Sequence, residues 1–279
     1  MLEWARTSDE AARQVQQRIL GYENGIKVWR NQLKSLADAD QMARKLEAEK
    51  SLREAVMSDP EMAAAYGSAW DDVERAIAAW NTMADEYRFI EDGKGLQGSL
   101  ARYAKTLVRG TAEREKPSAE RLRAYRDTAL PGVEQRLFAA RPISEGFETL
   151  SLSFSLDKLR EQLGPDHEVV KAVLGKESPR TLAERLVSET KLADAEYRKS
   201  LWEGGTEAVA ASDDPLIVLI RTIEPEALKL RKRFDDEVEA PRNQASEKIA
   251  QARFAILGKT VYPDATFTLR VTYGAVDGW

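Results

Sequence analysis

The hydrophobic positions of the chain recur mainly at steps of three and four residues. One stripe with this spacing comprises Ile26, Trp29, Leu33 and Leu36. An α-helix repeats about every 3.6 residues, so this spacing places the four side chains on one face of a helix whose other face is basic. The stripe predicts a helix that packs against another helix.

A second helical pattern starts at Asp59 and Pro60. The aspartate can accept hydrogen bonds from the first free amides of a helix, and a proline at the first helical position costs no hydrogen bond. Three glycines within residues 91–98 predict a loop that ends this pattern. The apolar seam between these two signals comprises Tyr66, Val73, Ile77, Trp80, Tyr87 and Ile90.

A third seam, from Leu216 to Ile256, spans about 60 Å at the helical rise of about 1.5 Å per residue. Pro225 and Pro241 are expected to break or kink it, because proline lacks the amide that an interior helical residue donates. Gly258 is expected to end it, since glycine readily adopts the left-handed conformation that closes many helices. Between the second and third seams, frequent Gly, Pro and capping residues predict a set of shorter helices.

The final stretch, residues 262–279, has a different period. Its apolar residues alternate with polar ones, which is the two-residue period of a β-strand with one buried face. The apolar face comprises Phe267, Leu269, Val271 and Tyr273. A single strand leaves its backbone groups unpaired, so another strand has to complete it.

These patterns together predict an all-α fold. We expect long antiparallel helices plus short helices, with a helical domain over residues 1–258 and one β-strand within residues 259–279. Helices that end in a strand without a partner are typical of an insertion or a fragment rather than of a self-contained domain.

Composition excludes several classes of function. Forty-two basic and forty-seven acidic residues give a net charge of −5, so the chain has no overall positive field to hold phosphates, and we expect no nucleic-acid partner. The longest aliphatic run, residues 216–220, is far shorter than the roughly 20 residues that cross a bilayer, and we expect no membrane segment. The absence of cysteine excludes disulfides, thiolate catalysis and cysteine-bound metals.

The sequence offers few groups for catalysis. Its one histidine, His167, lies at the expected start of a short helix, where a solvated or capping role is the ordinary one. Two Ser-x-x-Lys matches, residues 155–158 and 188–191, lack the accompanying motifs of Ser-Lys hydrolases. The acidic runs in residues 212–215 and 234–239 are typical of solvated helix faces. We therefore predict no catalytic residue, no cofactor and no metal site within this chain.

Three segments of the chain resemble one known family. Residues 252–279, ARFAILGKTVYPDATFTLRVTYGAVDGW, are similar nearly word for word to a segment of the bacterial serine dipeptidyl-peptidases, the family of dipeptidyl aminopeptidase BII and dipeptidyl-peptidases seven and eleven. Residues 191–221 resemble the segment before that family's last long helix, and residues 23–36, ENGIKVWRNQLKSL, resemble its Asn-x-x-Lys helix. The resemblance covers nearly all of the chain and is weakest over residues 90–190.

The resemblance implies a fold and a function. Members of that family are chymotrypsin-like double β-barrels with a large helical domain inserted between the histidine and aspartate of the catalytic triad and its serine. This chain would be the helical domain, which covers the active-site cleft and helps to release dipeptides from the free N-terminus of an oligopeptide. The triad would lie outside the chain, and residues 259–279 would re-enter the second barrel.

The resemblance also implies partners and a location. The partners would be the oligopeptide substrate and the double β-barrel catalytic domain of the same polypeptide, with a homodimer left open. The location would be the periplasm or the outside of the cell.

One substrate-binding residue follows from the same resemblance. The family binds the α-amino group of the substrate with an asparagine of its Asn-x-x-Lys helix, which corresponds to Asn24, with Lys27 three residues later. An amide carbonyl can accept a directed hydrogen bond from an ammonium without the full desolvation cost of a carboxylate. Asn24 also fits an ordinary polar residue near a turn, since residues 21–25 contain two glycines. Asn31 stands where the family commonly has a small residue, often glycine.

Two other functions are open on the sequence. The apolar seams would suit a stand-alone helical interaction module that pairs with a partner protein. The alternating residues 266–273 argue against it, because a free-standing bundle has no use for a half-buried strand. A small-molecule enzyme within a helical bundle would need Glu-x-x-His pairs, and the single histidine cannot supply them.

Overall fold

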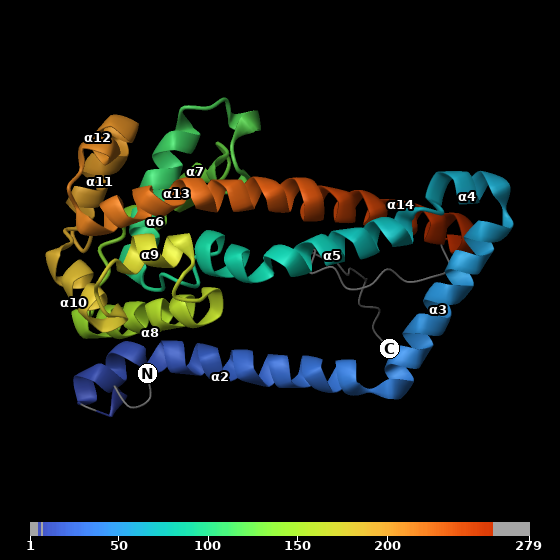
Figure 1. The fold of residues 1–279 in the computed structure, drawn as a ribbon, viewed down its shortest axis with the longest axis horizontal. Helices are drawn as coiled ribbons and strands as arrows, with labels where there is room; N and C mark the ends of the chain where they lie inside the picture. Colours follow the sequence, from blue (N-terminus) through green and yellow to red (C-terminus); the bar gives the residue numbers. More distant parts are fainter. Residues whose placement is uncertain (1–4, 7, 259–279) are drawn as a thin grey trace, which may run out of the picture. The chain divides into compact units, whose positions relative to one another are not determined.

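The computed structural model describes residues 5–6 and 8–258 of the 279-residue chain. Every regular element in these ranges is a helix, which confirms the all-α prediction for them (Figure 1). The predicted strand in residues 262–279 lies outside the described residues, so the boundary at residue 258 stays a prediction. The chain divides into two compact units, one formed by Met1–Ser35 and Ala76–Ala240 and the other by Leu36–Arg75 and Pro241–Trp279.

The larger unit contains most of the helices. Two π-helical turns, η1 (Tyr87–Glu91) and η4 (Asp235–Glu239), continue the helices α5 and α13, and two 3-10 helices, η2 (Ser118–Glu120) and η3 (Arg123–Tyr125), follow α6. The α-helices that lie wholly or largely in this unit are α2 (Asp9–Ala37), α5 (Ala69–Glu86), α6 (Ser99–Arg114), α7 (Leu130–Phe138), α8 (Glu145–Leu163), α9 (Glu168–Leu174), α10 (Pro179–Glu189), α11 (Ala195–Glu203), α12 (Gly205–Ala211) and α13 (Pro215–Phe234).

The core of the larger unit is built around α13. This helix packs against α6, η1 and α9, while α10 packs against α8. The third predicted seam is buried as expected, since Leu216, Ile220 and Ala227 each expose at most 2% of their surface. Burial of one large aliphatic side chain stabilises a fold by about 1.5–3 kcal/mol, so this stripe holds the surrounding helices in place.

The two prolines of the third seam lie in different places relative to the helix ends. α13 continues through Pro225 as one helix, because the burial of the residues on either side offsets the cost of about 3 kcal/mol for an interior proline. Pro241 is the second residue of α14 (Ala240–Leu257), directly after η4. Gly258 follows α14 with a φ of +61°, the left-handed conformation that the sequence predicted for this helix end.

The second seam is confirmed at several positions and wrong at one. Tyr87 and Ile90 are buried, but Ile77 is half exposed. Ala76 and Met83 take buried positions instead, each with 1% of its surface exposed. Alanine carries little hydrophobic signal, so the sequence pattern favoured the neighbouring isoleucine and placed this part of the seam one residue out of phase.

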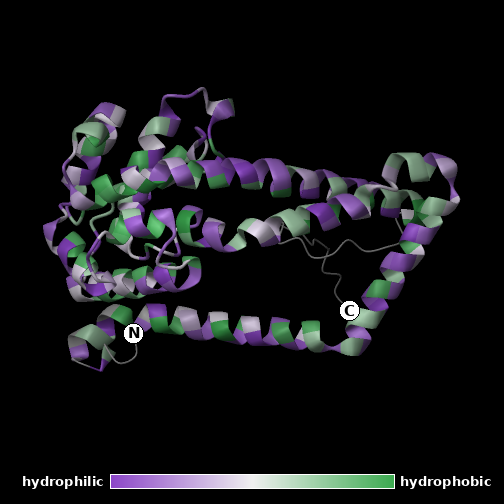
Figure 2. Cartoon of the chain, viewed as in Figure 1, coloured by the Kyte–Doolittle hydropathy of each residue, from purple (hydrophilic) through white to green (hydrophobic). Residues whose placement is uncertain are grey.

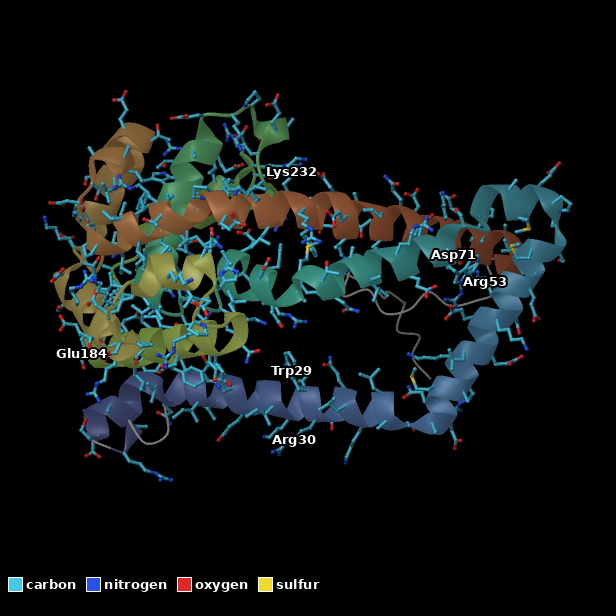
Figure 3. All side chains as sticks on the ribbon, in the orientation of Figure 1. Trp29, Arg30, Arg53, Asp71, Glu184 and Lys232 are labelled. Atoms are coloured by element: carbon cyan, nitrogen blue, oxygen red, sulfur yellow. The ribbon has the colours of Figure 1, made fainter. Side chains whose placement is uncertain are left out.

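The apolar stripe predicted for α2, from Ile26 to Leu36, is exposed and not packed as predicted, although the same face of the helix is buried nearer its start. Ala11 and Val15 are 5% and 0% exposed and begin the face that continues into the predicted stripe. Trp29 and Leu33 on the same face expose 69% and 64% of their surface. Figure 2 shows how apolar and polar residues alternate along α2, and in Figure 3 Trp29 and Arg30 point to opposite sides of the helix. The larger unit therefore covers the first turns of this face and leaves the predicted stripe exposed.

The smaller unit has a core of its own. It contains α3 (Ala39–Ser58), α4 (Pro60–Tyr66), the first turns of α5, and α14. Asp59 caps α4 as predicted, because its side chain accepts hydrogen bonds from the first amides of that helix. Arg53 and Asp71 link α3 to α5 through a 2.7 Å ion pair (Figure 3). The core cluster comprises Val56, Ala69, Trp70, Ala245 and Ala252.

Candidate functional site

The predicted substrate-binding residue, Asn24, lies in the middle of α2 and is exposed. The turn that the two neighbouring glycines suggested is wrong, because α2 continues without interruption through them. Lys27 and Asn31 follow about one and two helical turns later and are also exposed. These three residues form one face of the helix, which we call the α2 polar face. It offers amide oxygens as acceptors and an ammonium as a donor.

Contacts in the first half of α2 hold the helix on α6 and α8. The guanidinium of Arg18 donates a 3.4 Å hydrogen bond to the hydroxyl of Ser99 and lies 4.4 Å from the ring centre of Phe147. A cation over an aromatic ring contributes on the order of 0.5–1 kcal/mol at exposed sites. Val15, one turn earlier, is fully buried. The second half of α2, with the α2 polar face, therefore extends from an anchored base.

A buried cluster of four charges joins η1, α6 and α13. Arg109 donates to both carboxylate oxygens of Glu91 at 2.6 and 2.7 Å and to both of Glu224 at 2.6 and 3.0 Å. Lys105 donates to the backbone carbonyl of Glu91 and lies 3.5 Å from its carboxylate. Arg109 and Glu91 each expose 5% of their surface. Two positive and two negative groups make this ion cluster neutral, which limits the cost of burying its charges.

The pKa values of the two basic groups move in opposite directions. Burial lowers the pKa of Arg109, but hydrogen bonds to Glu91 and Glu224 outweigh that effect and raise it. Burial also lowers the pKa of Lys105, and attraction to Glu91 compensates only in part. Arg109 is therefore the permanent charge of the ion cluster, whereas Lys105 gives up its proton more readily than an ordinary lysine.

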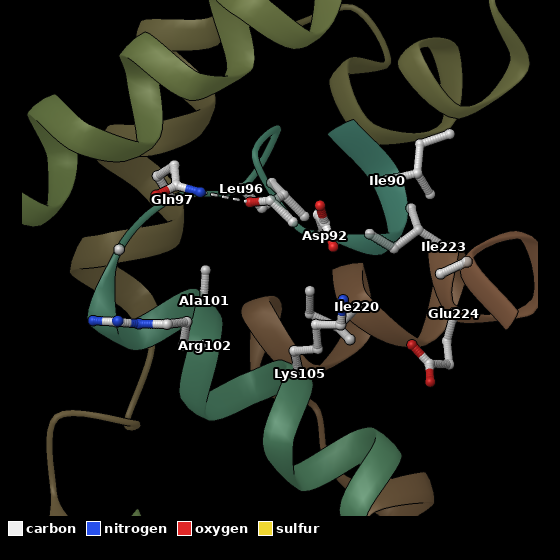
Figure 4. A pocket seen from close by; sticks show the side chains of 13 residues that line it. Ile90, Asp92, Leu96, Gln97, Ala101, Arg102, Lys105, Ile220, Ile223 and Glu224 are labelled. Atoms are coloured by element: carbon white, nitrogen blue, oxygen red, sulfur yellow. Dashed lines mark hydrogen bonds between the residues drawn. The ribbon is translucent and has the colours of Figure 1, made fainter. Parts of the chain in front are cut away.

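A cavity of about 90 Å³ lies beside the ion cluster (Figure 4). The loop after η1, the first turns of α6 and the middle of α13 enclose it. In Figure 4 the side chains of Asp92 and Lys105 project toward the central space, whereas Arg102 points away from it. Its apolar wall comprises Ile90, Leu96, Ala101, Ile220, Ile223 and Ala227. The cavity thus combines an apolar wall with charged groups at its edge.

Two side chains of α8 hold the loop that closes the cavity. Glu148 accepts a hydrogen bond from the amide of Leu100 at 3.1 Å, and Ser155 accepts one from the amide of Gln97 at 2.9 Å. Gly98 has a φ of +145°, and a Cβ there would lie 2.5 Å from the carboxylate of Glu148. Only glycine fits at that position. The buried Glu148 therefore caps the start of α6 and fixes one side of the cavity.

A buried tyrosine is expected to make the free energy of unfolding decrease at alkaline pH. Tyr87 is 5% exposed, and burial raises its pKa from 10.0 to about 12, although Arg231 donates a hydrogen bond to it at 3.1 Å. The unfolded chain releases this proton near pH 10, whereas the folded chain retains it to about pH 12. The stabilisation is therefore complete below pH 10 and is lost as the pH rises through 12.

The expected result is a late step in the tyrosinate absorbance of the folded protein, near pH 12. The Tyr87→Phe variant should reduce the late step without abolishing it, because burial also raises the pKa of Tyr125 to about 12. The control is the Tyr22→Phe variant, which removes a tyrosine that is 59% exposed. A late step of unchanged size in Tyr87→Phe, or an equal reduction of the late step in both variants, would contradict this prediction.

The other candidate groups have structural roles. His167 caps α9 as predicted, accepting a 3.2 Å hydrogen bond from the amide of Val169. Ser188 of one Ser-x-x-Lys match donates to the carbonyl of Arg185 at 3.1 Å. Asp214 of the acidic run caps α13. Within residues 5–6 and 8–258, no group of three or more histidine, cysteine, aspartate or glutamate side chains has the arrangement of a metal site.

The sequence analysis did not find the ion cluster or the cavity. Glu91 and Glu224 both bind Arg109, although 18 and 115 residues separate them from it. No local spacing connects such distant positions. The one available signal was a charge within an apolar run, as at Arg109 after Leu107 and Val108.

The family of the chain follows from a comparison with family models. The family described as Peptidase S46 matches residues 1–279. The chain therefore belongs to the peptidase S46 family, which confirms the resemblance to the serine dipeptidyl-peptidases. Membership implies dipeptidyl-peptidase activity and peptide substrates for the parent protein. Peptidases of this family are generally secreted or periplasmic. In the part of the chain that the structure describes, no helix is long and apolar enough to cross a membrane.

Proposed function

We propose that this chain is the helical domain of a serine dipeptidyl-peptidase and that the α2 polar face binds the free N-terminus of the oligopeptide substrate. Family membership supports the peptidase activity of the parent protein. The observation that carries the binding role is the position of Asn24, which is exposed in the middle of a helix whose first half is anchored. Its amide oxygen is therefore accessible to an incoming ammonium group.

The proposed role is binding rather than bond cleavage. The amide oxygen of Asn24 accepts a hydrogen bond from the α-ammonium group of the substrate. Lys27, about one turn away, repels that ammonium and attracts a carbonyl oxygen, so the pair favours one direction of the peptide along α2. The nucleophile and the general base belong to the double β-barrel domain of the same polypeptide, which residues 259–279 re-enter. The proposed location is the periplasm or the exterior of the cell.

Replacing Asn24 by alanine in the intact peptidase is expected to lower kcat/KM for substrates with a free N-terminus. A hydrogen bond to a charged group contributes about 1.5–3 kcal/mol, which corresponds to a loss of about 10- to 100-fold. The measurement is the kinetics of a dipeptidyl reporter substrate. An Asn24→Asp variant should retain more activity than Asn24→Ala, because its carboxylate still accepts from an ammonium.

The matched control is Gln32→Ala, which removes an exposed amide from another side of the same helix. That variant should keep the kinetics of the unmodified enzyme. Unchanged kinetics in Asn24→Ala, with the enzyme folded and active, would refute the role of Asn24. Equal losses in Asn24→Ala and Gln32→Ala would show that the helix, and not the amide, is responsible.

A further inference from the structure

The cavity beside the ion cluster has the features of a ligand site. We propose that it binds an aliphatic α-amino acid in its free form, with L-leucine as the representative ligand. The branched side chain occupies the apolar part, the ligand carboxylate accepts a hydrogen bond from Lys105, and the ligand ammonium pairs with Asp92. This inference stands apart from the α2 polar face and does not depend on it.

The apolar wall of the cavity determines which apolar group a ligand can place there. Each of its six apolar side chains exposes at most 7% of its surface, so the wall is almost completely shielded from solvent. Empty apolar cavities of about 150 Å³ take up a molecule as large as benzene. A cavity of about 90 Å³ therefore suits a smaller group, such as the isobutyl group of leucine.

The charged residues at the edge of the cavity determine which polar groups a ligand can place there. A lysine ammonium can donate three hydrogen bonds, and the contacts of Lys105 among the described residues go to the carbonyl and the carboxylate of Glu91. One N–H group is left for a ligand. The carboxylate of Asp92 has no hydrogen bond or ion pair with any residue that the structure describes, and it projects toward the same space (Figure 4).

The free hydrogen-bonding groups of the cavity favour a zwitterion over an ion of one sign. Arg109 holds Glu224, and Arg102 points away from the cavity (Figure 4), which leaves the third N–H of Lys105 and the carboxylate of Asp92 for a ligand. An α-amino acid adds one charge of each sign and satisfies both. An amine would leave the third N–H of Lys105 unused, and a carboxylate would leave Asp92 without a partner.

The test is a titration of the 279-residue chain with L-leucine, followed by the NMR signals of Ala101, Ile220 and Ile223. We expect saturable shifts with a dissociation constant on the order of 1 mM or lower. Three compounds that each lack one group, glycine, isoamylamine and isocaproate, should bind about tenfold more weakly. Equal binding of glycine would overturn the role of the apolar wall, and equal binding of isoamylamine or isocaproate would overturn the zwitterion assignment.

Two variants distinguish a loss of ligand binding from a loss of folding. Asp92→Asn should weaken L-leucine binding about tenfold while the thermal unfolding midpoint stays unchanged, because Asp92 is exposed and has no described partner to lose. Asp157→Asn, which changes a half-exposed carboxylate on α8, should bind L-leucine like the unmodified chain. Absence of saturable shifts in the unmodified chain, or unchanged affinity in Asp92→Asn, would overturn the proposal.

Discussion

Replacing Arg109 by methionine is expected to lower the free energy of unfolding by about 3–5 kcal/mol, the usual cost of removing one partner from a buried ion pair. Arg109 donates two hydrogen bonds to Glu91 and two to Glu224. Without it, two carboxylates with at most 12% of their side-chain surface exposed would face Lys105 alone within the ion cluster. The measurement is the denaturant midpoint at neutral pH.

Further variants separate the charge from the packing. Adding Glu224→Gln to Arg109→Met should recover part of the loss, because the ion cluster then retains only the Lys105 ammonium and the Glu91 carboxylate, which pair with each other. The control is Lys232→Met, which removes an ion pair with Asp236 whose two side chains are 77% and 60% exposed (Figure 3). That variant should leave the midpoint unchanged. A wild-type midpoint for Arg109→Met would show that the ion cluster contributes no stability.

Replacing Arg198 by methionine is expected to lower the free energy of unfolding by at least about 3 kcal/mol, because several buried acceptors lose their donors at once. Arg198 exposes 1% of its surface, and among the described residues each of its hydrogen-bond partners is a backbone carbonyl. Burial lowers its pKa, as expected for a cation without a carboxylate bonded to it. The four carbonyls, at 2.6–2.9 Å, are those of Leu137, Ala139, Leu192 and Ala193.

The effect of Arg198→Met should be concentrated where those carbonyls lie. They belong to the end of α7 and to the segment before α11, so amide hydrogen exchange should accelerate there first. Arg198→Lys should restore only part of the lost stability, because a lysine ammonium cannot reach all four carbonyls that the planar, forked guanidinium of arginine reaches. The control is Arg180→Met, which removes an exposed partner of Glu184 (Figure 3). Equal stability of Arg198→Met and Arg180→Met would contradict the prediction.

Local patterns predicted the helices and several of their ends. Asp59 and His167 cap the starts of helices, and Gly258 follows the end of one, as the sequence indicated. These ends were predictable because a cap depends on groups only two to four residues away. The family was also accessible from the sequence, since its resemblance rests on continuous segments. Asn24 was chosen on that resemblance. The structure adds that it is exposed in the middle of α2, and its role stays a prediction.

Packing decided the features that local patterns could not. In α5 the buried position is Ala76 and not Ile77. In α2 the predicted apolar stripe is exposed, although its period is that of a packed helix. The period of the hydrophobic pattern shows which side chains share a helix face, but their burial depends on what packs against that face. A helix that continues through Pro225 likewise reflects the burial of its neighbours.

The ion cluster and the cavity depend on tertiary structure for the same reason. Arg109 and Glu224 are 115 residues apart, and their contact exists because α6 and α13 pack together. The sequence by itself therefore determined the helical class, the helix ends and the family, which rest on short-range spacing and continuous similarity. Only the tertiary structure decided which charges are buried together and where an apolar space opens beside them, because both depend on side chains that the fold brings together from distant positions.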